Sequence, residues 1–136
     1  MALPSIGGGR QLGDGNLNEL VLSTCPAPAT FTADATVTAA DLTSGIISCN
    51  KGSDAATALT LPTVAALETL LVNAKVGSCF DVAILNVASG SSADVTVTTN
   101  TGWTLSGLMV VQNATSAAFR ARKTGTAAWS LYAISR

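Results

Sequence analysis

Short apolar runs separated by turn residues occupy the chain from about residue 35 onward, a pattern typical of β-strands. The alternation is strictest in DVTVTT, where Val95 and Val97 are predicted to point inward and Thr96 and Thr98 outward. Seven further runs have the same character: residues 36–39, 45–49, 57–61, 78–87, 108–112, 116–123 and 128–135. In the run 116–123, Phe119 is predicted to lie on the face opposite Arg120 and Arg122. About eight short strands are therefore expected.

One segment, residues 64–73, has a helical rather than a β-type period. Its apolar residues recur at the spacing of one helix face: Val64, Leu67, Leu70 and Leu71. Thr63 is expected to cap the N-terminus of this helix. A helix of about three turns persists only when it packs its apolar side on a sheet. The elements together predict a mainly β fold, a β-sandwich or jelly-roll-like domain with one short helix and an extended N-terminal arm.

The run 78–87 is apolar on both faces, with Val82 and Ile84 on one side and Ala83 and Leu85 on the other. A strand of this kind is normally covered on both sides. The helix, a second sheet or a neighbouring subunit could provide the cover.

Residues 1–33 differ from the rest of the chain, because they contain three of its four prolines and the run Gly7, Gly8, Gly9. Gly and Pro at this density favour extended or turning backbone without a core of its own. We therefore predict an arm over residues 1–33 and a β-rich domain over residues 34–136. The start lacks the apolar stretch of a secretion signal, and no apolar run is long enough to span a bilayer, so we expect synthesis in the cytoplasm and no membrane partner.

Charged residues make up only 11% of the chain, and the formal net charge is −1. An average soluble domain has about 25% charged residues, which keep it apart from its neighbours. A chain with so few charges is expected to cover much of its surface with copies of itself or with a partner. Nucleic acid is not the expected partner, because phosphate binding needs clustered Lys and Arg.

Enzyme chemistry is not expected, because the chain has no histidine and therefore no Ser-His-Asp or Cys-His site. The main carboxylates are scattered and are expected mostly in turns or at strand starts, capping backbone amides: Asp34, Asp41, Asp54, Glu68, Asp81 and Asp94. Three widely spaced cysteines form no CxxC pair, and they are either buried reduced thiols or include one disulfide: Cys25, Cys49 and Cys79. Trp103 and Trp129 are expected either to pack in the core or to form a platform that binds carbohydrate. No metal and no cofactor is predicted.

Two groups of residues are candidates for partner contact. The first lies in the arm, in the string GGGRQLGDGN: Gly7, Gly8, Gly9, Arg10, Gln11, Asp14 and Asn16. This string lacks the Gly-Lys-Ser/Thr of a phosphate-binding loop, and the D-x-N-x-N opening at Asp14 lacks the glycine and the final Glu of a calcium loop. The second group is the basic cluster Arg120, Arg122 and Lys123, interpreted as three charges on one strand face, either solvated or docked on an acidic partner surface.

Four pieces of sequence occur in an order that resembles the small decoration (cement) proteins of tailed-bacteriophage heads. They are GGGRQLGDGNLNE, LTLPTVAALETLLVNAKVGSCFDVAILNV, DVTVTTNTGWTLSG and FRARKTGTAAWSLYAIS, and they span nearly the whole chain from Gly7 onward. The resemblance implies a late structural protein of the virion, a homotrimer on the capsid exterior that clamps neighbouring capsomers. It implies the major capsid protein and other copies of the chain as partners, and an arm that lies across one of them. It implies no catalytic or metal-binding residues.

The alternative is a head-fibre or tail-fibre (spike) module that contacts the host surface, with surface glycans as its partner. Fibre proteins usually add a coiled or repeated shaft, and this chain has neither heptads nor an evident internal repeat. The number of copies in each virion distinguishes the two, with hundreds expected for decoration and tens or fewer for a fibre.

Overall fold

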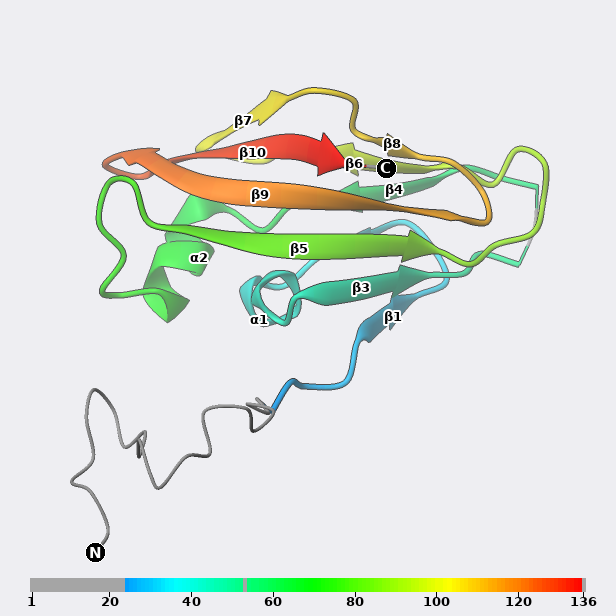
Figure 1. The fold of residues 1–136 in the computed structure, drawn as a ribbon, viewed down its shortest axis with the longest axis horizontal. Coiled ribbons are helices and arrows are strands. Elements are labelled where there is room, and N and C mark those ends of the chain that lie inside the picture. Colours follow the sequence, from blue (N-terminus) through cyan, green and yellow to red (C-terminus); the bar gives the residue numbers. More distant parts are fainter. Residues whose placement is uncertain (1–23, 53, 136) are drawn as a thin grey trace, which may run out of the picture.

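The computed structural model describes residues 24–52 and 54–135, which form two β-sheets packed face to face with two short helices at one end (Figure 1). The six-stranded sheet has the order β1-β3-β5-β9-β10-β7. Its strands are β1 (Ala29–Phe31), β3 (Ile46–Cys49), β5 (Cys79–Asn86), β9 (Thr115–Gly125), β10 (Ala128–Ser135) and β7 (Trp103–Ser106). The four-stranded sheet is made of β2 (Ala35–Thr36), β4 (Thr57–Thr60), β6 (Val95–Thr98) and β8 (Val110–Val111). The predicted mainly β sandwich is confirmed.

The chain alternates between the two sheets as it winds. It passes from β1 to β2, returns through helix α1 (Ala39–Thr43) to β3 and β4, and returns again through helix α2 (Val64–Leu70) to β5 and β6. Each turn stacks in parallel on the one before, so β1, β3 and β5 are parallel neighbours, as are β2, β4 and β6. A jelly roll is built from antiparallel neighbours, so that alternative is not the observed topology.

The last part of the chain closes the sandwich in a different way. The long strand β9 runs antiparallel to β5, and β10 folds back on β9 as a hairpin. Strand β7, which the sequence analysis did not predict, pairs in parallel with the outer side of β10 and brings Trp103 beside Trp129.

The core lies between the sheets, where the inward positions of both meet. The predicted inward residues Val95, Val97 and Phe119 are buried, while Arg120 and Arg122 are exposed, so the alternation read from the sequence is confirmed. The largest fully buried side chains come from both sheets and both helices: Trp129, Phe119, Leu42, Ile47, Leu59, Leu61, Leu67, Leu131, Val64, Val82, Val95 and Val111.

Helix α2 confirms the predicted helix and its cap, because the Thr63 side chain accepts a hydrogen bond from the Ala66 amide. Val64 and Leu67 are buried, but Leu70 is half exposed, so the apolar stripe is only partly covered. The second helix, α1, was not predicted. It begins with a capping box, in which the side chain of Thr38 accepts from the Asp41 amide and the side chain of Asp41 accepts from the Thr38 amide. These two hydrogen bonds satisfy backbone amides that the first turn of a helix leaves without partners.

The folded domain begins before residue 34. Strand β1 pairs with β3 and forms an edge of the six-stranded sheet, so the end of the predicted arm, residues 29–33, belongs to the domain. Residues 24–28 of the predicted arm are described and form neither helix nor strand, and residues 1–23 lie outside the described residues.

Candidate partner-binding site

The outer face of the six-stranded sheet carries small, apolar and uncharged polar side chains in rows across the strands. One row joins Ile46, Ala83 and Ala118, which are direct neighbours on β3, β5 and β9. The next row joins Ser48 and Leu85. The outer side of β5 was predicted to be covered, and within the described residues its side chains Ala83 and Leu85 are only partly buried.

An ion pair borders this face, between Asp81 on β5 and Arg120 on β9. The Arg120 guanidinium is bidentate, because its Nε donates to Asp81 Oδ1 at 2.7 Å and one terminal nitrogen donates to Oδ2 at 2.8 Å. This hydrogen bond lowers the pKa of the Asp81 carboxyl below its ordinary value. Both side chains are about half exposed, so water screens the pair, and its main effect is to hold two charges in one fixed geometry.

Lys123 does not share a face with Arg120 and Arg122, and the single basic face expected from the sequence is therefore corrected. An odd separation along a strand turns Lys123 to the opposite side. There its ammonium pairs with Glu68 on α2 at 2.7 Å and donates to the Ala74 carbonyl oxygen at 3.2 Å. Of the three predicted residues, only Arg120 and Arg122 are exposed on this outer face.

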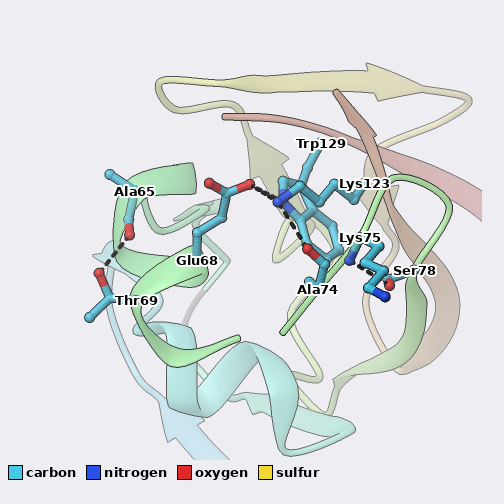
Figure 2. A network of polar contacts seen from close by, with 8 residues as sticks. All are labelled: Ala65, Glu68, Thr69, Ala74, Lys75, Ser78, Lys123 and Trp129. Carbon is cyan, nitrogen blue, oxygen red and sulfur yellow. Dashed lines mark hydrogen bonds and ion pairs between the residues drawn. The ribbon is translucent and has the colours of Figure 1, made fainter. Parts of the chain in front are cut away.

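Figure 2 shows how this lysine joins a polar network at the helical end of the sandwich. Glu68 Oε1 also accepts a hydrogen bond from the indole nitrogen of Trp129 at 3.2 Å. The hydrogen bond from Lys123 is the main reason that the pKa of Glu68 lies below its ordinary value. No local pattern predicts this contact, because Glu68 and Lys123 are 55 positions apart.

Both tryptophans are core residues. Trp129 is buried and lies 6.2 Å from Trp103, centroid to centroid, with the two rings tilted by 50°. The indole nitrogen of Trp103 donates to the Pro62 carbonyl oxygen at 2.7 Å. Neither ring forms an exposed platform for a sugar, which decides between the two interpretations of this pair.

The three cysteines are free thiols, so none of them forms a disulfide in this structure. Cys49 is buried, and its desolvation raises the pKa of the thiol to about 11. Cys25 and Cys79 are exposed. Burial as reduced thiols therefore describes Cys49 and not the other two.

Several carboxylates cap backbone amides as expected. Asp34 accepts from the Ala58 amide at 3.0 Å, and Asp94 accepts from the Asn113 amide at 3.1 Å. Within residues 24–52 and 54–135, no three His, Cys, Asp or Glu side chains gather as a metal site would require. The two helices described are too short to cross a membrane.

The contact residues predicted in the arm lie outside the described part of the chain: Gly7, Gly8, Gly9, Arg10, Gln11, Asp14 and Asn16. Comparisons with protein-family models, with curated proteins and with solved structures found no match.

Proposed function

We propose that this chain is a capsid decoration (cement) protein, which binds the outer surface of an assembled phage head as a homotrimer and stabilises contacts between capsomers through its N-terminal arm. The observation that carries the proposal is the outer face of the six-stranded sheet. Ile46, Ala83, Leu85 and Ala118 give it an apolar, nearly uncharged centre, on a chain with only 11% charged residues. Such a face gains free energy when a neighbour covers it.

The arrangement of charge supports a protein neighbour over a polyanion. Asp81 neutralises Arg120, and Glu68 neutralises Lys123, so two of the three cations of the basic cluster are already paired within the chain. Arg122 and the Asp81–Arg120 pair lie on the same face, along one side of the apolar centre. An apolar patch with a polar rim is the usual anatomy of a protein–protein interface.

The proposed mechanism couples binding of this protein to assembly of the shell. A protein that binds the assembled lattice more tightly than loose capsid subunits shifts the equilibrium toward the shell. Three arms on one trimer bind as a unit, so contacts that are weak singly give a strong combined affinity. In this proposal the string at residues 7–16 lies across the major capsid protein, because its glycines permit close approach of the two backbones.

Co-sedimentation with purified phage heads tests the proposal. The full chain is expected to pellet with heads at hundreds of copies per particle, and a variant that lacks residues 1–16 is expected to lose most of that binding. Circular dichroism of the truncated variant controls for the β domain, which should melt at the same temperature as that of the full chain. Absence of binding by the full chain, or equal binding by both, would overturn the proposal. Binding to host-surface glycans at tens of copies per virion would favour the fibre module instead.

A further inference from the structure

A pocket of about 330 Å³ opens at the helical end of the sandwich, between the C-terminal end of α2 and the start of β5. Most of the side chains that line it are apolar: Leu70, Leu71, Val72, Ala74, Phe80 and Trp129. Phe80 and Trp129 pack with their ring centroids 5.9 Å apart, and the Trp129 indole is held by its hydrogen bond to Glu68 (Figure 2). The pocket therefore has a fixed aromatic wall.

The volume of the pocket sets the size of the ligand that it can hold. An apolar cavity of about 150 Å³ binds one benzene ring. A pocket of about 330 Å³ therefore has room for about two rings. Ligand sites of this size are usually lined by apolar and aromatic side chains with a few polar groups. Here the polar groups are Asn73 and Ser78, on the loop that joins α2 to β5.

Two cations lie beside this pocket without a carboxylate partner in the described part of the chain. Residues 24–52 and 54–135 contain five Lys and Arg side chains, and three of them form ion pairs there. The other two are Lys75, which directly follows the lining residue Ala74, and Arg122 on β9. The cations that the described carboxylates leave unpaired are thus found together at one place.

The turn that precedes β5 brings both cations to the pocket. Its backbone is held by hydrogen bonds from the Lys75 amide to Ser78 Oγ at 3.0 Å and from the Ser78 amide to the Lys75 carbonyl oxygen at 2.8 Å. Arg122 is the direct cross-strand neighbour of Cys79, another lining residue. The Arg122 guanidinium lies against the same turn, because a Cβ added to Gly77 would be 4.0 Å from one of its terminal nitrogens.

The carboxylates on α1, α2 and β5 do not neutralise these two cations. Glu68 and Asp81 each pair with another cation, and Asp41 accepts hydrogen bonds from Thr38 in the capping box. The mouth of the pocket therefore carries two positive charges, on a chain whose formal net charge is −1. A ligand with a negative charge beside an apolar body complements both parts of the site.

We propose that this pocket binds a small amphipathic anion, an aromatic group of about two rings that carries one carboxylate or sulfonate. The rings lie against Phe80 and the aliphatic side chains of the lining, and the anionic group lies at the mouth beside Lys75 and Arg122. Binding removes apolar surface from water at Leu70 and Val72, which are 50% and 75% exposed. The inference does not rest on the capsid function, and it applies to the isolated protein.

Calorimetric titration with two naphthalene derivatives tests the proposal. Naphthoate carries the expected anion, and the naphthamide of the same isomer has the same rings without the charge. Naphthoate is expected to bind at one site per chain and about tenfold more tightly than the amide, because two exposed charge contacts together contribute about that factor. Equal affinities for the two compounds, or no binding of naphthoate, would overturn the proposal.

A charge variant tests the role of the two cations. Lys75→Gln/Arg122→Gln is expected to weaken the binding of naphthoate about tenfold and to leave the binding of naphthamide unchanged. The matched control is Lys51→Gln, which removes a cation just after β3, at the end of the sandwich where β5 finishes, and should change neither affinity. An unchanged affinity for naphthoate in the double variant, or an equal loss in the control, would contradict the assignment.

An apolar variant tests the position of the rings. Leu70→Ser/Val72→Ser is expected to weaken both compounds alike, by at least about fivefold. The matched control is Val87→Ser/Leu108→Ser, since these residues are 51% and 48% exposed and do not line the pocket. Circular dichroism melting checks that both variants fold. Equal losses in the two variants would mean general binding to exposed apolar side chains and would overturn the site. No heads are present, so every outcome is independent of capsid binding.

Discussion

Asn86, at the end of β5, donates a hydrogen bond of 3.1 Å to the carbonyl oxygen of Val111 on β8 and so ties the six-stranded sheet to the four-stranded one. The same amide nitrogen donates to the Ala93 carbonyl at 2.7 Å, and the Asn86 side-chain oxygen accepts from the Ala88 amide at 3.2 Å. This side chain is 1% exposed. Every buried polar side-chain atom in the described part of the chain has a partner, and Asn86 satisfies three backbone groups at once.

Replacement of Asn86 by Ala should therefore be strongly destabilising. Two carbonyl oxygens and one amide lose their partner at a buried site, and we expect a loss of about 3 kcal/mol in the free energy of unfolding. Urea unfolding monitored by tryptophan emission measures the loss. Thr98→Ala is the control, because it removes the half-buried Thr60–Thr98 hydrogen bond on the outer face and should cost about 1 kcal/mol or less. Equal costs would contradict the role assigned to Asn86.

Gly102 and Gly45 allow the cost of a positive φ to be compared with the cost of a steric clash. Both have a φ near +90°, so an added Cβ is strained at either position. At Gly45 the Cβ meets nothing within 4 Å, whereas at Gly102 it lies 2.8 Å from the Ala127 carbonyl oxygen and 2.7 Å from Val64. We expect Gly45→Ala to cost about 1 kcal/mol and Gly102→Ala at least about 3 kcal/mol. Thermal and urea unfolding of the two variants give the comparison, and similar costs would show that the approach at Gly102 relaxes easily.

Thiol labelling should distinguish the three cysteines. Maleimide at neutral pH is expected to modify Cys25 and Cys79 in the folded protein and to modify Cys49 only after unfolding, since burial keeps its thiol protonated with a pKa of about 11. Intact mass before and after denaturation in urea counts the adducts. Two adducts should become three, and a third adduct on the native protein would contradict the burial of Cys49.

Acid should weaken the contacts made by Glu68 and Asp81. Each carboxyl has a folded-state pKa below its ordinary value, for Glu68 because Lys123 donates to it and for Asp81 because Arg120 does. The stability that each contributes is fully present above its unfolded-state pKa and is lost as the pH falls through the lower folded-state pKa. Melting temperatures between about pH 6 and pH 2 should therefore fall less steeply for Glu68→Gln than for the unmodified chain.

A control and a contrary outcome make the acid experiment decisive. Lys123→Met removes the hydrogen-bond donor, so the pKa of Glu68 should return toward its ordinary value. The melting temperature should then fall less steeply on acidification, as in Glu68→Gln. Asp54→Asn, in the exposed turn before β4, serves as the matched loss of one carboxylate elsewhere. If the melting temperature falls equally steeply with pH in Glu68→Gln and in the unmodified chain, the stabilising role of this pair is contradicted.

Self-association tests the outer face of the six-stranded sheet. Ala118→Arg introduces a cation at the centre of the row formed with Ile46 and Ala83 and should prevent oligomer formation without unfolding the domain. Thr96→Arg, on the outer face of the four-stranded sheet, is the control and should leave association unchanged. Sedimentation velocity of the three proteins gives the oligomeric state. A monomeric unmodified chain at all concentrations would remove the support for a homotrimer.

Local pattern was sufficient to predict most of the strands. Alternation placed Phe119 inside and Arg120 outside, and the Thr63 cap placed the start of α2, because both depend on neighbours within a few residues. The same alternation, applied to Lys123, would have separated it from the two arginines. The capping box of α1 was also present in the sequence as Thr38 and Asp41, but the helix is too short to show an apolar period.

The order of residues along the chain was enough to predict the mainly β composition and the helix after Pro62, and it shows the low charge and the lack of histidine directly. Three features became known only from the folded domain: the parallel winding of the strands between two sheets, the Glu68–Lys123 ion pair and the pocket beside Phe80. The reason is physical. Periodicity records which side of an element is buried, but strand partners, ion pairs and cavities depend on residues far apart in the chain, whose meeting is fixed by the packing of the whole domain.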